Sequence, residues 1–137
     1  MDSLKFAKQI AQLILNKKGY DIKILDIRKI STISDFFVIC SAEVDKQVKA
    51  IADEVEEKLN LKGVKCFNRE GYETLNWVIL DYFDVIVHIF RTEARNYYNL
   101  EKLWGDAPVI PIEDEEEPKP KRTTKKSQSP SKKKTEK

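Results

Sequence analysis

The chain has 137 residues, of which 41% are apolar and 35% charged, and its formal net charge is +2. This length suits one domain that buries about two thirds of the chain's surface. The charge is unevenly divided, because residues 1–112 hold 16 basic and 17 acidic side chains, whereas residues 113–137 hold 9 and 6. The near-neutral body argues against a protein that binds nucleic acid by electrostatics.

The cysteines and the hydropathy indicate the cellular compartment in which the protein is expected. No apolar run approaches the roughly 20 residues of a membrane-spanning helix, and Asp2 stands where a secretory leader would carry basic residues. Cys40 and Cys66 lie too far apart for a metal or redox pair, and Cys40 falls in an apolar run. The sequence therefore predicts a reduced, cytoplasmic protein without a membrane partner.

Hydrophobic periodicity predicts eight elements in the first 112 residues. Helices are expected where apolar residues recur with the 3.6-residue period, and strands where short runs are apolar or alternate. The predicted helices are 4–18, 44–61 and about twelve residues from Thr92 to Trp104, and the predicted strands are 21–27, 34–41, 64–67 and two within 77–91. We expect Ser3 to cap the first helix and Gly19 to end it in the left-handed conformation.

A β-hairpin is predicted where two apolar runs flank an acidic break, in the stretch WVILDYFDVIVHIFR. If residues 82–83 form a two-residue turn, Asp81 pairs with Asp84 and Trp77 with His88. Alternation then makes one face of the hairpin aliphatic and gives the other an indole, an imidazole and two carboxylates. That mixed face carries Trp77, Ile79, Asp81, Asp84, Ile86 and His88. Such a mixture is typical of a recognition surface, although a Trp–His pair is more often half-buried structure.

The order α-β-β-α-β-β-β-α indicates an α/β (or α+β) fold with a mixed sheet, in a single domain over residues 1–112. Two apolar strands flank the long helix, so we expect a crossover connection, with helices over at least one face of the sheet. Residues 113–137 are acidic and then rich in Lys, Pro, Ser and Thr. We predict that they form a disordered tail, whose basic runs could contact RNA non-specifically.

Residue patterns that carry catalysis are missing from the sequence. The four glycines are isolated, so there is no phosphate-binding loop. His88 has no second histidine to form a zinc site, and no serine sits in a nucleophile elbow. Asp81 and Asp84 could act as metal or acid–base carboxylates, but two carboxylates across a tight turn more often form the turn itself. We expect no catalytic residue, no metal and no cofactor.

Four long blocks carry a resemblance to a known family. They are SDFFVI at 34–39, DKQVKAIADEVEEKL at 45–59, WVILDYFDVIVHIFR at 77–91 and EARNYYNLEKLWGDA at 93–107, and REG at 69–71 fits as well. In these blocks, from about residue 4 to 107, the sequence resembles the ribosomal silencing factor family, also called the Iojap-like family. Two features depart from it: Phe83 stands where the family usually has Gly, and the tail falls outside the common pattern.

The resemblance implies a nucleotidyltransferase-like fold without the chemistry of those enzymes. Ser34 and Asp35 open the matching strand, but Phe36 and Phe37 follow where the enzymes carry metal-binding carboxylates. The implied function is repression of translation, under nutrient limitation. Family members bind the large ribosomal subunit through its fourteenth protein, block association with the small subunit sterically, and form homodimers when free.

With this function, the mixed face of the hairpin becomes a candidate protein-docking surface, since Trp and Tyr are common interface anchors. The predicted partner-binding residues are Trp77, Ile79, Asp81, Tyr82, Asp84 and His88, extended by Tyr98, Lys102 and Trp104 of the last helix. Two alternatives stay open at this point. One is an assembly factor of the large subunit, and the other, less favoured, is a nucleotidyltransferase enzyme.

Overall fold

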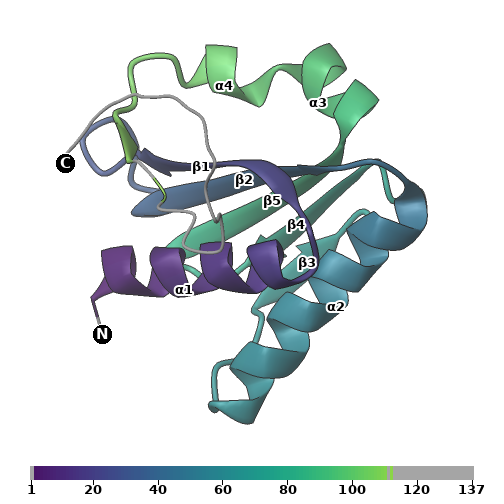
Figure 1. Cartoon of the computed structure of the whole chain (residues 1–137). Helices are drawn as coiled ribbons and strands as arrows, with labels where there is room; N and C mark the ends of the chain where they lie inside the picture. Colours follow the sequence, from purple (N-terminus) through teal and green to yellow (C-terminus); the bar gives the residue numbers. More distant parts are fainter. Residues whose placement is uncertain (1, 111, 113–137) are drawn as a thin grey trace, which may run out of the picture.

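The computed structural model describes residues 2–110 and 112, which fold into one six-stranded mixed sheet with helices on both faces (Figure 1). The elements are α1 (Ser3–Asn16), β1 (Tyr20–Asp26), β2 (Phe36–Ala42), α2 (Asp45–Leu61), β3 (Asn68–Glu70), β4 (Trp77–Asp81), β5 (Val85–Arg91), α3 (Thr92–Tyr98), α4 (Leu100–Leu103) and β6 (Val109–Ile110). The mixed α/β fold is confirmed. The predicted disordered tail at 113–137 lies outside the described residues.

The first face of the sheet is covered by α1 and α2, which lie below it in Figure 1. Each helix has an apolar stripe because its apolar residues recur with the helical period. The buried side chains of the two stripes are Phe6, Ala7, Ile10, Ala11, Ile14, Val48, Ile51, Ala52, Val55 and Leu59. They pack against the aliphatic side chains of the sheet and form the larger core cluster.

Both ends of α1 differ in detail from the prediction. The cap is Asp2 rather than Ser3, because the Asp2 carboxylate accepts the Leu4 backbone N–H at 3.0 Å. At the other end Lys18 adopts the positive φ, of 67°. Gly19 is required for close packing instead, since a Cβ there would lie 2.3 Å from the Ile14 side chain.

The centre of the sheet is β2, all seven residues of which are buried. It pairs antiparallel with β1 on one side and parallel with β5 on the other. A parallel pair needs a crossover connection, and here α2, β3 and β4 make it. The predicted crossover and mixed sheet are therefore confirmed, with the strand order β3-β4-β5-β2-β1-β6.

The β4–β5 hairpin forms in a register two residues away from the predicted one. Its pairs include Trp77–Phe90, Ile79–His88 and Asp81–Ile86. The predicted pairing of Asp81 with Asp84 and of Trp77 with His88 is therefore wrong. A shift of two residues preserves the alternation of side chains, so Trp77, Ile79 and His88 still share a face.

The turn of this hairpin is Phe83–Asp84 rather than Tyr82–Phe83. The Tyr82 N–H donates to the Val85 carbonyl at 2.9 Å, and the Asp84 N–H donates back to the Tyr82 carbonyl at 2.8 Å. Phe83, between the last two groups, has a φ of 69°. This is the geometry of a γ-turn with a positive φ, which is strained for any residue but Gly.

The second face of the sheet is covered by α3 and α4, above it in Figure 1. The sequence predicted one helix here, but Asn99 takes the left-handed conformation (φ 49°) and divides it in two. The third predicted strand is also displaced, from 64–67 to Asn68–Glu70, and β6 was not predicted. No helix in the described residues combines the length and the apolar character needed to cross a membrane.

Candidate protein-docking surface

The second face of the sheet is only partly covered. A smaller core cluster fills the space between the sheet and α3–α4, built from Leu25, Ile27, Phe37, Ile39, Ile86, Phe90, Leu100 and Ala107. The part of the face that belongs to β4 and β3 is more exposed: alternate residues of β4 are only half-buried, and all of β3 is exposed. The residues predicted to bind a partner lie in both the covered and the exposed parts of this face, or outside it.

Trp77, at the start of β4, is half-buried and points to the second face. Its ring stacks on buried Phe90, with the centroids 4.9 Å apart and the planes at 26°. Tyr98, at the end of α3, lies against the same indole at 4.8 Å. The indole N–H donates to His88 Nδ1 at 3.1 Å. The predicted juxtaposition of Trp77 and His88 therefore exists, diagonally across the strands.

His88 itself is 5% exposed and has the ring of Phe37 at 4.6 Å. Burial lowers the pKa of His88 to about 3, so its imidazole is neutral near pH 7. The structure leaves His88 little surface for a partner to contact. The sequence could not show this, because the side chains packed against His88 come from other strands, Phe37 from β2 and Trp77 from β4.

The three residues predicted in or beside the turn, Asp81, Tyr82 and Asp84, lie in different environments. Asp81 is half-buried, and its carboxylate accepts the Phe83 N–H at 2.8 Å. Asp84 is exposed in the turn. Tyr82 is 6% exposed and packs edge-on against Phe6 at 5.8 Å, in the core of the first face. Tyr82 is therefore not on the face that carries Trp77.

Of the three residues predicted on the last helix, Tyr98 joins this surface and is 47% exposed. Trp104 is half-buried farther along the chain, where its ring meets Phe37 at 5.1 Å. Lys102 is exposed on α4. The break at Asn99 places Tyr98 on α3 and Lys102 on α4, so they do not share one helix.

The edge strand β3 adds residues that the sequence analysis missed. Asn68 pairs with Asp81 and Glu70 with Ile79, and directly paired residues point to the same face. The stretch is polar and has no apolar alternation that would indicate a strand. The exposed surface, which we call the Trp77 face, consists of Asn68, Glu70, Trp77, Ile79, Asp81 and Tyr98. It has an apolar, aromatic centre and an acidic rim.

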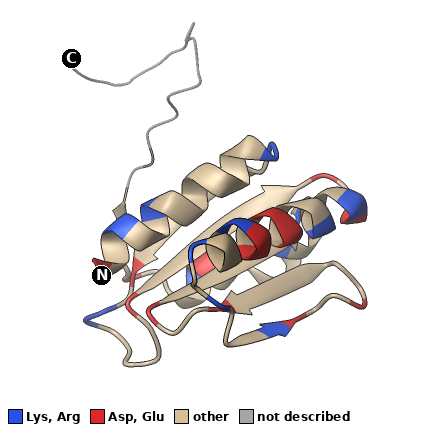
Figure 2. Cartoon of the chain, turned by 90° about the horizontal axis from the view of Figure 1, so that it is seen from below, with Lys and Arg blue, Asp and Glu red and all other residues tan. Residues whose placement is uncertain are grey.

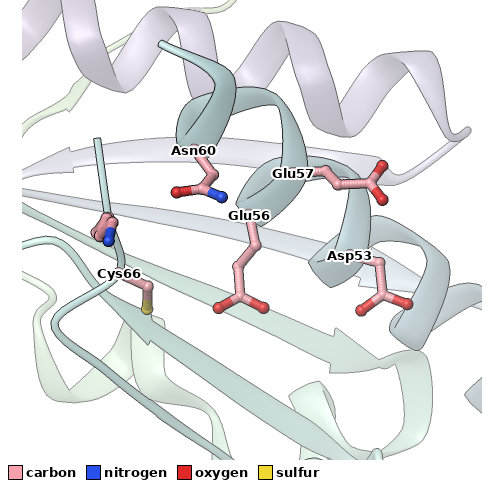
Figure 3. A pocket seen from close by; sticks show the side chains of 6 residues that line it. Asp53, Glu56, Glu57, Asn60 and Cys66 are labelled. Atoms are coloured by element: carbon pink, nitrogen blue, oxygen red, sulfur yellow. The ribbon is translucent and has the colours of Figure 1, made fainter. Parts of the chain in front are cut away.

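A separate cavity of about 500 Å³ opens beside α2, on the other side of the molecule. The acidic residues of α2 are red on the ribbon in Figure 2. Its lining residues are Asp53, Glu56, Glu57, Asn60, Lys65 and Cys66 (Figure 3). The Glu56 carboxylate accepts from Arg69 at 2.8 Å and from the Tyr72 hydroxyl at 3.2 Å. Burial and then Glu56 raise the pKa of Cys66, which leaves the thiol a weak nucleophile.

Neither region resembles a metal centre. Within residues 2–110 and 112, no group of three or more His, Cys, Asp or Glu side chains is arranged to hold a metal ion. Asp35, the carboxylate at the entry to β2, accepts a hydrogen bond from the Ser3 hydroxyl at 2.9 Å and so pairs with α1. What the geometry offers instead is the Trp77 face, a surface suited to contact with another macromolecule.

Comparisons with known proteins agree with one another. A family model described as "Ribosomal silencing factor during starvation" matches residues 1–137. Ribosomal silencing factor RsfS of Halalkalibacterium halodurans is 44% identical over 110 residues, which cover 77% of this chain and 94% of that protein. RsfS of Bacillus subtilis is 41% identical over 113 residues, covering 82% and 96%.

A solved structure supports the same assignment. The crystal structure of a protein from Chromobacterium violaceum matches with a TM-score of 0.74 and 34% identity, covering 77% of this chain and 88% of that one. Both named relatives are described as ribosomal silencing factors. The model match spans the whole chain and the relatives are aligned over nearly their full length, so this protein belongs to the ribosomal silencing factor (RsfS) family.

Proposed function

We propose that this protein represses translation by binding the large ribosomal subunit through its fourteenth protein, where it sterically blocks association with the small subunit. The observation that carries the proposal is the Trp77 face, a half-exposed aromatic centre with an acidic rim on an otherwise well-covered sheet. The names of the relatives, ribosomal silencing factors, support a ribosomal partner.

The chemistry of the Trp77 face suits such a partner. Trp and Tyr are frequent anchors of protein interfaces because each buries a large area with few rotatable bonds. A protein that is embedded in ribosomal RNA carries Lys and Arg to neutralise phosphates. The carboxylates of Glu70 and Asp81 would complement such side chains around the aromatic centre.

Repression by this route needs no turnover. A bound domain prevents joining when it occupies space that the small subunit requires, so the protein needs affinity and position, not a reactive group. We accordingly propose that it is not an enzyme. A titration with nucleotide and magnesium tests this separately, and saturable binding would favour a nucleotidyltransferase.

Two linked measurements test the proposed function. In the first, the protein is sedimented with isolated large and small subunits, and we expect it to pellet with the large subunit alone. In the second, subunit joining is followed by light scattering, and we expect inhibition that saturates as the large subunits are filled. Binding to the small subunit, or to neither, would contradict the proposal. Binding to the large subunit without inhibition would favour the assembly factor.

The homodimer implied by the family resemblance stays a prediction. Sedimentation velocity of the protein alone over a range of concentrations tests it, because a dimer that forms only when the protein is free should dissociate on dilution and disappear on addition of large subunits.

A further inference from the structure

The hydrogen bond between Trp77 and His88 fixes the protonation of the histidine. An indole N–H can only donate, so His88 Nδ1, 3.1 Å away, must be the acceptor and carries no proton. The single proton of the neutral imidazole is then on Nε2. A doubly protonated imidazole could not make this bond, and the buried ring is neutral near pH 7.

Packing alone does not explain a histidine at position 88. Its Nε2 is buried, and no group among the described residues pairs with it. A buried donor without a partner destabilises the folded state, whereas an apolar ring at this position would have no such group. The side-chain hydrogen bond that the structure gives His88 is the one from Trp77. The interaction that an imidazole makes here, and that an apolar ring could not make, is therefore the hydrogen bond with the Trp77 indole.

The indole is held from three directions. Phe90 stacks beneath it at 4.9 Å, Tyr98 lies against it at 4.8 Å, and His88 accepts its N–H. Stacking alone allows a flat ring to slide or turn over, whereas the hydrogen bond defines which edge points inward. A side chain that is already fixed before binding loses less conformational entropy when the partner docks.

We propose that His88 is a positioning residue for docking: by accepting the indole N–H, it holds the Trp77 ring in the orientation that the large subunit recognises. This inference rests on the docking function proposed above. It assigns His88 no contact with the partner, and it separates the role of His88 in binding from any role in stability.

Two substitutions at position 88 distinguish positioning from packing. His88→Phe keeps a buried ring but removes the acceptor and the unpaired Nε2–H. His88→Asn places its side-chain oxygen near the position of Nδ1 but leaves a cavity and unpaired N–H groups. We expect His88→Phe to melt close to the parent, because it removes the unpaired Nε2–H but leaves the indole N–H without its acceptor. It should bind large subunits about threefold to tenfold more weakly. We expect His88→Asn to melt lower and to bind within about twofold of the parent.

If His88 positions the indole, the more stable variant, His88→Phe, should be the weaker binder. If His88 is purely structural, the less stable variant should also be the weaker binder. If His88→Phe melts below His88→Asn, or binds as tightly as the parent, the proposal is overturned. The Trp77→Phe background supplies the control: without an indole N–H, His88→Phe should not weaken binding any further. An equal weakening in both backgrounds would also overturn it.

An NMR measurement on the uncomplexed protein tests the hydrogen bond independently of the ribosome. The indole N–H signal of Trp77 should move towards the position of a solvent-exposed indole in His88→Phe and stay near its parent position in His88→Asn, while the Trp104 signal remains unchanged in both. An unchanged Trp77 signal in His88→Phe would contradict the proposal. If the parent does not bind large subunits, the docking function fails, and this signal still decides whether His88 orients the indole.

Discussion

At the scale of single residues, Phe83 is held in a conformation that its side chain disfavours. Its φ is 69°, and the residue is 59% exposed. Its ring meets the exposed ring of Phe67 with the centroids 4.3 Å apart. Besides the hydrogen bond from the Phe83 N–H to the Asp81 carboxylate, the contact between the two exposed rings offsets little of the backbone strain, because both rings stay in contact with water.

We expect Phe83→Gly to be neutral or stabilising, because Gly adopts a positive φ without strain. Phe83→Ala is the matched control, since it removes the ring but keeps a Cβ in the strained turn. Gly should therefore be more stable than Ala by about 1 kcal/mol in urea unfolding. A glycine variant that is less stable than the alanine variant would show that the turn is not strained.

At the scale of secondary-structure elements, a buried ion pair attaches α3 and α4 to the sheet. Arg95 is 5% exposed, and its guanidinium donates to both carboxylate oxygens of Glu101, at 2.9 and 3.1 Å. It also donates to the Asp21 carbonyl at 2.6 Å and to the Ser41 hydroxyl at 2.8 Å. Because α3 carries Tyr98, this network helps to fix one side of the Trp77 face.

The network predicts a dependence of stability on pH. Hydrogen bonds from Arg95, and then from Lys23, lower the pKa of Glu101 from 4.5 to about 2. A lowered pKa in the folded state stabilises the protein above the unfolded pKa, and this contribution is lost as pH falls from about 4.5 towards 2. Glu101→Gln should therefore reduce the free energy of unfolding by about 1–3 kcal/mol at pH 7 and by less near pH 2.

Urea unfolding at several pH values measures this difference. Glu93→Gln is the control on α3, because the Glu93 carboxylate pairs with Arg91 at 2.8 Å but its side chain is 83% exposed. Exposed ion pairs contribute little, so this variant should stay close to the parent. A pH-independent loss in Glu101→Gln would mean that the ionised carboxylate is not the stabilising group.

In the molecule as a whole, the two faces of the sheet are covered to different extents. The first face is sealed by α1 and α2 and supplies most of the core. The second is covered by α3 and α4 (Figure 1), but β3 is exposed and alternate residues of β4 are only half-buried. The fold thus presents the Trp77 face on a rigid sheet, which suits docking without a large conformational change.

The sequence predicted the elements and the faces better than the pairings. Period and alternation are local, so α1, α2, β2 and the mixed face of β4 could be inferred. The hairpin register could not, because it depended on a turn in which Phe83 rather than Gly takes a positive φ. The burial of His88 depends on side chains of other strands, such as Phe37, and the placement of Tyr82 on the first face depends on Phe6 of α1.

The last 25 residues, 113–137, differ in composition from the folded part. Residues 113–137 have no apolar periodicity and combine five consecutive acidic residues with a Lys-rich stretch. We expect their deletion to change the free energy of unfolding by less than about 0.5 kcal/mol and to leave binding to large subunits intact. Weaker sedimentation of the truncated protein would identify the tail as a second contact.

The affinity of Trp77→Ala for large subunits, measured beside its melting curve, decides whether the Trp77 face is the docking surface. Removing an interface anchor costs at least about 2 kcal/mol of binding, or roughly 30-fold. Truncating a half-buried Trp should cost less stability than the roughly 3–5 kcal/mol of a fully buried one. Leu61→Ala, at the end of α2 and 81% exposed, is the control and should bind as the parent does.

We predict that Trp77→Ala remains folded, loses at least about 30-fold in affinity and no longer inhibits subunit joining. If the folded variant instead sediments with large subunits as tightly as the parent, the Trp77 face is not the docking surface.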